Sequence, residues 1–184
     1  MDNLYIDKVL SGDSHAFRYF VKTYKDMAFS LAISIVKNEL LAEEVVQDAF
    51  LQAYLSLAQF KKQAKFSTWF YRIVVHCSYS SLKKRSWDTV PIEPLEEVME
   101  MDESIISKLI EEEQTQLIQD ALLQLPGQEA LALRLFYLEE LHLEEITQIT
   151  GWTLANTKVI LHRARKRMSI EVQKHLIGQE NARR

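Results

Sequence analysis

The sequence has little cysteine, glycine and proline, and it lacks a long apolar run. A single cysteine in 184 residues excludes an internal disulfide framework and a zinc site built from cysteines. Four glycines and three prolines leave few turn signals, which disfavours β-rich folds with frequent tight turns. The longest nearly apolar stretch, residues 27–36, is too short to span a bilayer, and no basic-then-apolar signal pattern opens the chain. We therefore expect a cytoplasmic protein without membrane insertion.

The sequence also contains no arrangement typical of an enzyme or a metal site. Its five histidines are scattered without an HExxH motif, and it has no Gly-rich phosphate loop. Pairs of adjacent glutamates fall on expected helices, where exposed charge is a simpler interpretation than an acid–base couple. Cys77 has no sequence signature of a nucleophile, so we expect it to pack as a small apolar group. No catalytic residue, metal ligand or cofactor is predicted.

Charge is distributed unevenly along a chain whose net charge is only −4. Residues 61–87 carry seven basic and no acidic side chains, and residues 158–184 carry eight basic and two acidic ones. Residues 88–124 carry one basic and eleven acidic side chains. The net charge alone argues against nucleic-acid binding, but two basic segments separated by an acidic one indicate two anion-binding surfaces.

Helical periodicity without a convincing alternating strand predicts an all-α protein. Asp13 is a good N-cap for the first apolar-periodic run, and Ser67 or Thr68 is expected to cap the helix after the basic loop. Pro-containing acidic sequence after Arg85 predicts an extended linker. The first expected helix follows Asp13 and extends through Tyr24. The others cover residues 25–37, about 40–57, 67–84, 102 or 103 to 125, 128–139, 143–150 and 154 to about 173.

The last two expected helices, separated by Gly151-Trp152-Thr153, form the pattern of a helix-turn-helix. Lys158, His162 and Arg165 share one face of the second helix, whereas the side expected to be buried is supplied by Ile160, Leu161, Ala164 and Met168. A solvated cationic helix end is the alternative, because basic residues near a helix C-terminus interact favourably with the helix dipole. The turn before this helix favours the DNA-binding interpretation.

Aromatic and basic residues alternate in residues 65–72, with further lysines before and after them. Aromatic rings stack on unpaired bases and cations bind phosphates, so the pattern suits single-stranded nucleic acid. Alternatively, Trp69, Phe70 and Ile73 form the core side of an amphipathic helix. That alternative does not explain seven cations and no acid between Lys61 and Arg85.

An acidic face on the third of these helices, with Glu43, Glu44, Gln47 and Asp48, is either solvated charge or a docking surface for a partner. With all three patterns in order, the chain resembles a bacterial sigma factor of the ECF (extracytoplasmic function) class of the sigma-70 family. The likeness lies in residues 42–54 (AEEVVQDAFLQAY), in residues 65–73 (KFSTWFYRI), and from Leu125-Pro126 to residues 162–165 (HRAR).

The resemblance implies an initiation factor without catalytic activity or cofactor, made of two small helical domains. Residues 1–86 resemble the four-helix sigma region 2, residues 87–114 the acidic linker, and residues 115–184 the helix-turn-helix of region 4. The implied partners are core RNA polymerase, through the clamp helices of its β′ subunit and the β flap, promoter DNA, and an anti-sigma factor.

The resemblance also assigns roles to single residues. The residues that match the face docking on the β′ clamp helices are Glu44, Gln47 and Asp48. A second set matches the surface that melts the −10 element and captures an extruded base, with some of its members supporting that surface from behind. This set is Lys61, Lys62, Lys65, Phe66, Ser67, Trp69, Tyr71 and Arg72. Those that match positions facing the −35 element are Lys158, Val159, His162 and Arg163, and those assigned to phosphate are Arg165 and Lys166.

Several positions depart from the family's usual pattern. In the expected recognition helix, Val159 replaces a base-reading Ser and Ile160 replaces an Arg, so fewer hydrogen bonds to bases are expected. Thr147 and Thr157 replace Ala and Val, and each hydroxyl must find a backbone carbonyl. Residues 76–81 (HCSYSS) replace the commoner Asn-Leu-Ala-Ile-Asp-Tyr.

Two other classes of function stay open at this point. One is a helix-turn-helix regulator that does not bind core polymerase, which would need no strand-melting loop. The other is a protein that binds only other proteins, which would need neither basic segment.

Overall fold

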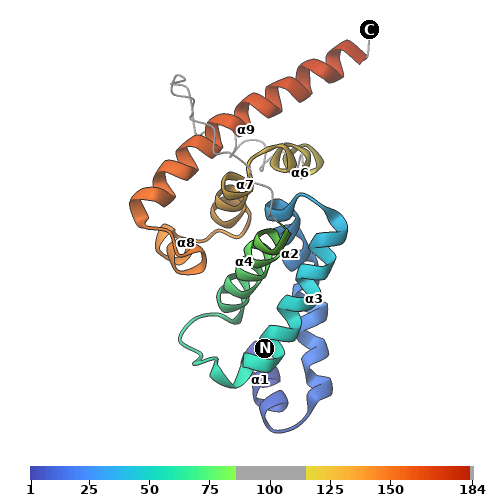
Figure 1. The fold of residues 1–184 in the computed structure, drawn as a ribbon, viewed down its shortest axis with the longest axis vertical. Coiled ribbons are helices and arrows are strands. Elements are labelled where there is room, and N and C mark those ends of the chain that lie inside the picture. Colours follow the sequence, from blue (N-terminus) through green and yellow to red (C-terminus); the bar gives the residue numbers. More distant parts are fainter. Residues whose placement is uncertain (86–114, 183–184) are drawn as a thin grey trace. The chain divides into compact units, whose positions relative to one another are not determined.

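The computed structural model describes residues 1–85 and 115–182, and these residues contain helices but no strand, so the all-α prediction is confirmed. Figure 1 shows the helices along the chain. They are α1 (Asp2–Leu10), the 3-10 turn η1 (Ser14–Phe17), α2 (Arg18–Val36), α3 (Glu39–Ser56), η2 (Leu57–Gln59), α4 (Phe66–Arg85), α6 (Thr115–Gln124), α7 (Gly127–Leu133), the π-helical turn η3 (Arg134–Leu138), α8 (Leu143–Thr150) and α9 (Leu154–Ala182).

The described residues form two compact units, one containing residues 1–85 and the other containing most of residues 115–182. The predicted acidic linker, residues 87–114, and the predicted start of a helix at Asp102 or Glu103 lie outside the described residues.

The first unit is built from α2, α3 and α4, which pack against one another (Figure 1). On α3 an apolar stripe is buried, from Leu41 through Val45, Ala49 and Ala53, because residues four apart share one helix face. Asn38 caps this helix by accepting a hydrogen bond from the Leu41 N–H at 2.9 Å. The Phe70 ring of α4 packs against Phe50 of α3 and against Phe66 of its own helix, with ring centroids 4.7 and 5.8 Å apart.

Of three local expectations about this unit, the cap at Asp13 is confirmed and the other two are wrong. The two helices predicted before and after Tyr24 are the single helix α2, since the sequence contains no breaking residue there. Asp13 caps η1, the turn that leads into α2, and accepts from the Ala16 N–H at 3.3 Å. Helix α4 begins at Phe66, with the Trp69 N–H donating to the Lys65 carbonyl, so Ser67 and Thr68 lie within its first turn rather than at its cap.

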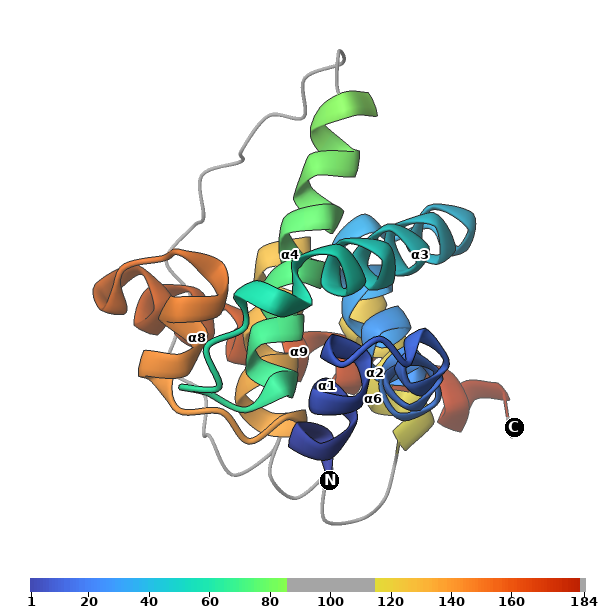
Figure 2. The ribbon, with the colours of Figure 1, turned by 90° about the horizontal axis from the view of Figure 1, so that it is seen from below.

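Helix α1 was not predicted. It is held against α2 by its first residue, because the Asp2 carboxylate accepts hydrogen bonds from the hydroxyls of Tyr19 and Tyr24 at 2.8 and 2.7 Å. Between η2 and α4 the chain runs as an open loop, which extends away from α3 and α4 in Figure 2.

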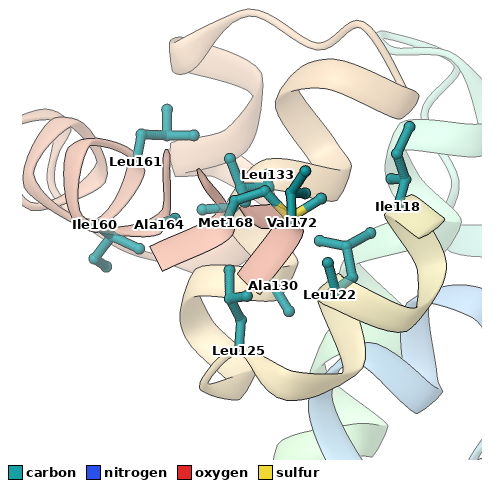
Figure 3. Packing of buried hydrophobic residues seen from close by; sticks show 12 residues of the cluster. Ile118, Leu122, Leu125, Ala130, Leu133, Ile160, Leu161, Ala164, Met168 and Val172 are labelled. Atoms are coloured by element: carbon teal, nitrogen blue, oxygen red, sulfur yellow. The ribbon is translucent and has the colours of Figure 1, made fainter. Parts of the chain in front are cut away.

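The second unit is a helix-turn-helix on two supporting helices. Its core joins α6, α7 and α9, and Figure 3 shows Met168 and Val172 of α9 beside Leu133 of α7. Gly151 ends α8 in the left-handed conformation, with φ of 75°, which a glycine adopts without strain. Helix α8 has the predicted bounds, whereas α9 continues past the predicted end near Gln173 to Ala182.

Candidate nucleic-acid interface

The exposed face of α9 carries four of the residues predicted to meet the −35 element. Lys158, Val159, His162 and Arg163 are exposed, and the Val159 side chain presents an apolar surface with 46% exposure. Ile160 is buried, so the departure from the family's usual Arg at this position concerns packing rather than base contacts.

Core packing fixes the orientation of that face. The predicted buried side of α9 is confirmed, since Ile160, Leu161, Ala164 and Met168 are all buried. The hydroxyl of Thr157 donates to the Thr153 carbonyl at 3.0 Å and that of Thr147 to the Glu144 carbonyl at 2.7 Å, as the sequence predicts.

Arg165 is less available than Lys158 and Arg163 on the same helix. Its Nε–H donates to the Tyr137 hydroxyl at 2.9 Å, and its guanidinium lies over the Phe136 and Tyr137 rings, 5.4 and 5.7 Å from their centroids. Arg165 therefore ties the helix to η3, while Lys166 beside it is half-buried.

The loop before α4 presents a second basic surface. Lys61, Lys62, Lys65 and Arg72 are exposed, on the loop and the first two turns of α4. Because these cations come from one short segment, they gather on one part of the unit, where they can bind phosphates.

The aromatic residues of this segment divide between core and surface. Phe66 and Tyr71 are only 2% and 6% exposed, so neither lies on the surface, and both belong to the residues that support it. Trp69 is partly exposed and packs on Phe60 and Phe66, 5.1 and 5.5 Å between ring centroids, and Ser67 is also partly exposed. Only Trp69 of these three rings is available for stacking on a base.

The acidic residues predicted to dock on a partner lie on the solvent side of α3. Glu44, Gln47 and Asp48 are exposed, and Glu44 and Asp48 line an open groove of about 450 Å³ between α3 and α4. Leu51 and Leu55 line the same groove and are 57% and 72% exposed. The sequence analysis did not select these leucines, although they continue the row of Glu44 and Asp48 at helical spacing.

The lone cysteine lies in this groove as a packed side chain. Its thiol donates to the Gln52 side-chain oxygen at 3.2 Å. Burial, followed by the nearby Asp48 carboxylate, raises the pKa of Cys77, which disfavours the reactive thiolate.

Across residues 1–85 and 115–182, no group of three or more His, Cys, Asp or Glu side chains could hold a metal ion. Within the same residues, none of the helices combines the length and the apolar character needed to cross a membrane.

Comparison with known proteins identifies the chain. The family described as Sigma-70 region 2 matches residues 20–88, and the one described as Sigma-70, region 4 matches residues 115–168. The ECF RNA polymerase sigma factor SigW of Bacillus subtilis (strain 168) is 29% identical over 170 residues, which cover 88% of this chain and 91% of the relative. The ECF RNA polymerase sigma-E factor of Escherichia coli (strain K12) is 29% identical over 185 residues, with 94% of each chain covered. The chain belongs to the ECF class of the sigma-70 family.

The ECF sigma factor has the fold of solved sigma-factor structures. CnrH, in complex with the cytosolic domain of CnrY, aligns with a TM-score of 0.63 at 18% identity over 94% of this chain and 97% of that one. The sigma factor RpoE of Bartonella quintana, in complex with the anti-sigma factor NepR, aligns with a TM-score of 0.64 at 21% identity over 85% of this chain and 96% of that one.

The two matched regions correspond to the two basic surfaces. Region 2 includes α3, the basic loop and α4, and region 4 includes the helix-turn-helix. The protein is an RNA polymerase sigma factor of the ECF class, and this family is not known as enzymatic.

Proposed function

We propose that this sigma factor brings core RNA polymerase to promoters whose −10 element is read by residues 1–86 and whose −35 element is read by residues 115–184, with residues 87–114 as the connecting linker. The observation that carries the proposal is that each unit of one chain exposes its own basic surface, one on a loop beside an aromatic side chain and one on a helix-turn-helix. It acts in the cytoplasm, with no catalytic residue and no cofactor.

At the −10 element, the cations of the loop and α4 hold the backbone of the separated strand while Trp69 stacks on an unpaired base. Phe66 and Tyr71 keep the first turns of α4 in place from the core side. Flipping a base out of a duplex costs a few kcal/mol, so contacts made only with the separated strand must offset it.

At the −35 element, α9 enters the major groove with Lys158, Val159, His162 and Arg163 toward the bases. Val159 suits the methyl group of a thymine but cannot donate a hydrogen bond to a guanine, so the preferred sequence is expected to have a thymine there. Arg165 and Lys166 approach the phosphates, Arg165 with a guanidinium already held by Tyr137.

Core polymerase docks on α3 through Glu44, Gln47 and Asp48, which meet the β′ clamp helices, and the second unit meets the β flap. Leu51 and Leu55 extend the docking face into the groove beside α4, because exposed leucines next to charged groups are typical of protein interfaces. The complex of the similarly folded sigma factor RpoE with the anti-sigma factor NepR supports an anti-sigma factor as a further partner.

The decisive test is run-off transcription with core polymerase from the host, with and without this protein, on a pool of genomic promoter fragments. Factor-dependent transcripts are expected, and their start sites would reveal both promoter elements. An absence of transcripts together with an absence of co-migration with core polymerase would contradict the proposal and favour a helix-turn-helix regulator.

Docking can be tested separately with the double variant Gln47→Ala and Asp48→Ala. Both side chains are exposed, so the variant should keep its melting temperature but co-purify less with core polymerase. The control is Asp26→Ala on α2, which removes an exposed carboxylate outside the proposed face. Equal co-purification of the double variant and the wild type would remove these residues from the docking surface.

A further inference from the structure

Helix α1 precedes the matched region 2 and has no place in the surfaces described so far. We propose that Asp7 of α1 competes with DNA phosphate for Lys62 and so limits the affinity of the −10 surface for single-stranded DNA. This proposal rests on the proposed function, in which Lys62 contacts the backbone of the separated strand.

The position of Asp7 is fixed by the residues that precede it. The Asp2 carboxylate accepts from two tyrosine hydroxyls of α2, and the Tyr5 ring is stacked on the Tyr19 ring at 4.0 Å between centroids. Ile6 is completely buried. With these contacts holding α1 in place, the next side chain along the helix, Asp7, extends from a rigid support.

The Asp7 carboxylate accepts a hydrogen bond from the Lys62 ammonium, in an ion pair that joins residues 55 positions apart. Both side chains remain partly exposed, so solvent and ligands can reach the pair. Lys62 also has a left-handed backbone, with φ of 55°, which a residue with a Cβ adopts at a cost. Asp7 therefore holds the ammonium of a residue whose backbone conformation is uncommon and whose neighbours in the loop are also basic.

A phosphate that approaches Lys62 meets the negative charge of Asp7 at the same ammonium. Either the ion pair opens, and its energy is lost, or phosphate and carboxylate share the cation and repel each other. Exposed ion pairs contribute roughly 0.2–1 kcal/mol, so removing the carboxylate should tighten binding by a factor of about 1.4 to 5.

The test uses the full chain bound to core polymerase and a fluorescent oligonucleotide of the non-template strand from a −10 region mapped by run-off transcription. Asp7→Asn should bind this probe more tightly than the wild type, by a factor of about 1.4 to 5. Asp26→Asn, which removes one exposed carboxylate from the same unit, is the control for net charge.

The double variant with Lys62→Ala separates the pair from other effects of Asp7. Asp7→Asn should have no effect on affinity in a Lys62→Ala background, because the ammonium for which Asp7 and phosphate compete is absent. The proposal is overturned if Asp7→Asn binds no more tightly than Asp26→Asn, or if its gain persists without Lys62. If the wild type itself does not bind the probe above core polymerase alone, the proposed function of the loop fails, and the role of Asp7 fails with it.

Discussion

The basic side chains of α9 differ in how strongly they are held by contacts within the protein. Lys158 and Arg163 project into solvent, whereas Arg165 is bound to Tyr137 and covered by two rings. Sequence alone places all three at helical spacing on or near one face and cannot separate them. The separation depends on Phe136 and Tyr137, which come from the preceding η3 turn.

Lys158→Ala should weaken binding to a −35 duplex by about 1–3 kcal/mol without changing the melting temperature, because the side chain is exposed and contributes nothing to the core. Fluorescence anisotropy with the duplex measures the change. Lys174→Ala is the control on the same helix, since Lys174 is exposed and pairs with Glu171 at 2.8 Å. An unchanged affinity of the Lys158 variant would remove this residue from the DNA interface.

Glu129 is a buried carboxylate, 7% exposed, whose oxygen lies 3.2 Å from the Nε of Arg167 without the geometry of a hydrogen bond. Burial raises its pKa, although Arg167 and Arg163 oppose the shift. The folded protein therefore holds this proton more tightly than the unfolded chain. The resulting stabilisation is complete below the ordinary pKa of 4.5 and is lost as the pH rises through the folded-state value.

Glu129→Gln imitates the protonated side chain, so at neutral pH the variant should melt at a higher temperature than the wild type. The difference should shrink as the pH is lowered toward 4.5, where the wild-type carboxyl is protonated as well. Thermal unfolding of both proteins across this range checks it. A variant that is less stable than the wild type at neutral pH, by a margin that shrinks as the pH falls, would show that the charged pair with Arg167 stabilises the fold.

The helices were predictable where burial pattern and capping agree. Helix α3 follows its stripe of Leu41, Val45 and Ala49, and α8 lies between His142, whose N–H donates to Glu145, and the left-handed Gly151. Helix α1 was missed because it buries only Ile6, and its hold on α2 comes from Asp2 contacting tyrosines far along the chain. Single-sequence periodicity does not register such contacts.

The candidate site was predictable in position and less so in detail. The cations of residues 61–72 and the recognition face of α9 are exposed where the sequence predicted nucleic-acid contacts. The sequence could not distinguish Phe66 and Tyr71, which face the core, from Trp69, because aromatic residues that follow one another on a helix point in different directions. Nor does the charge count of the loop reveal that Lys62 is paired with Asp7.

At the end of α2, Lys37 adopts a left-handed conformation with φ of 55° while its N–H bonds the Ile33 carbonyl. Glycine takes this conformation without the clash that a Cβ creates. Lys37→Gly should therefore raise the free energy of unfolding by about 0.5–1 kcal/mol in urea titrations. Lys25→Gly, in the interior of the same helix, should lower it by about 1 kcal/mol. Destabilisation of similar size at both positions would mean that the Lys37 side chain contributes more than its backbone costs.

On the scale of the whole molecule, the two units have separate hydrophobic cores. Phe70 is completely buried in the first and packs against Phe50 and Phe66. Leu122 is buried in the second, among residues of α7 and α9. A protein built this way divides its stability between two cores, while the proposed function requires both surfaces at once.

Damage to one core should consequently abolish one DNA contact and spare the other. Phe70→Ala is expected to cost about 3–5 kcal/mol and Leu122→Ala about 2–5 kcal/mol, each enough to unfold a small domain. With full-length variants, Phe70→Ala should lose binding to the −10 strand in complex with core polymerase but keep the affinity of the wild type for a −35 duplex. Leu122→Ala should lose the duplex and keep the strand. If either substitution abolishes both contacts, the two units fold as one cooperative body, and promoter recognition depends on a single stability that both cores share.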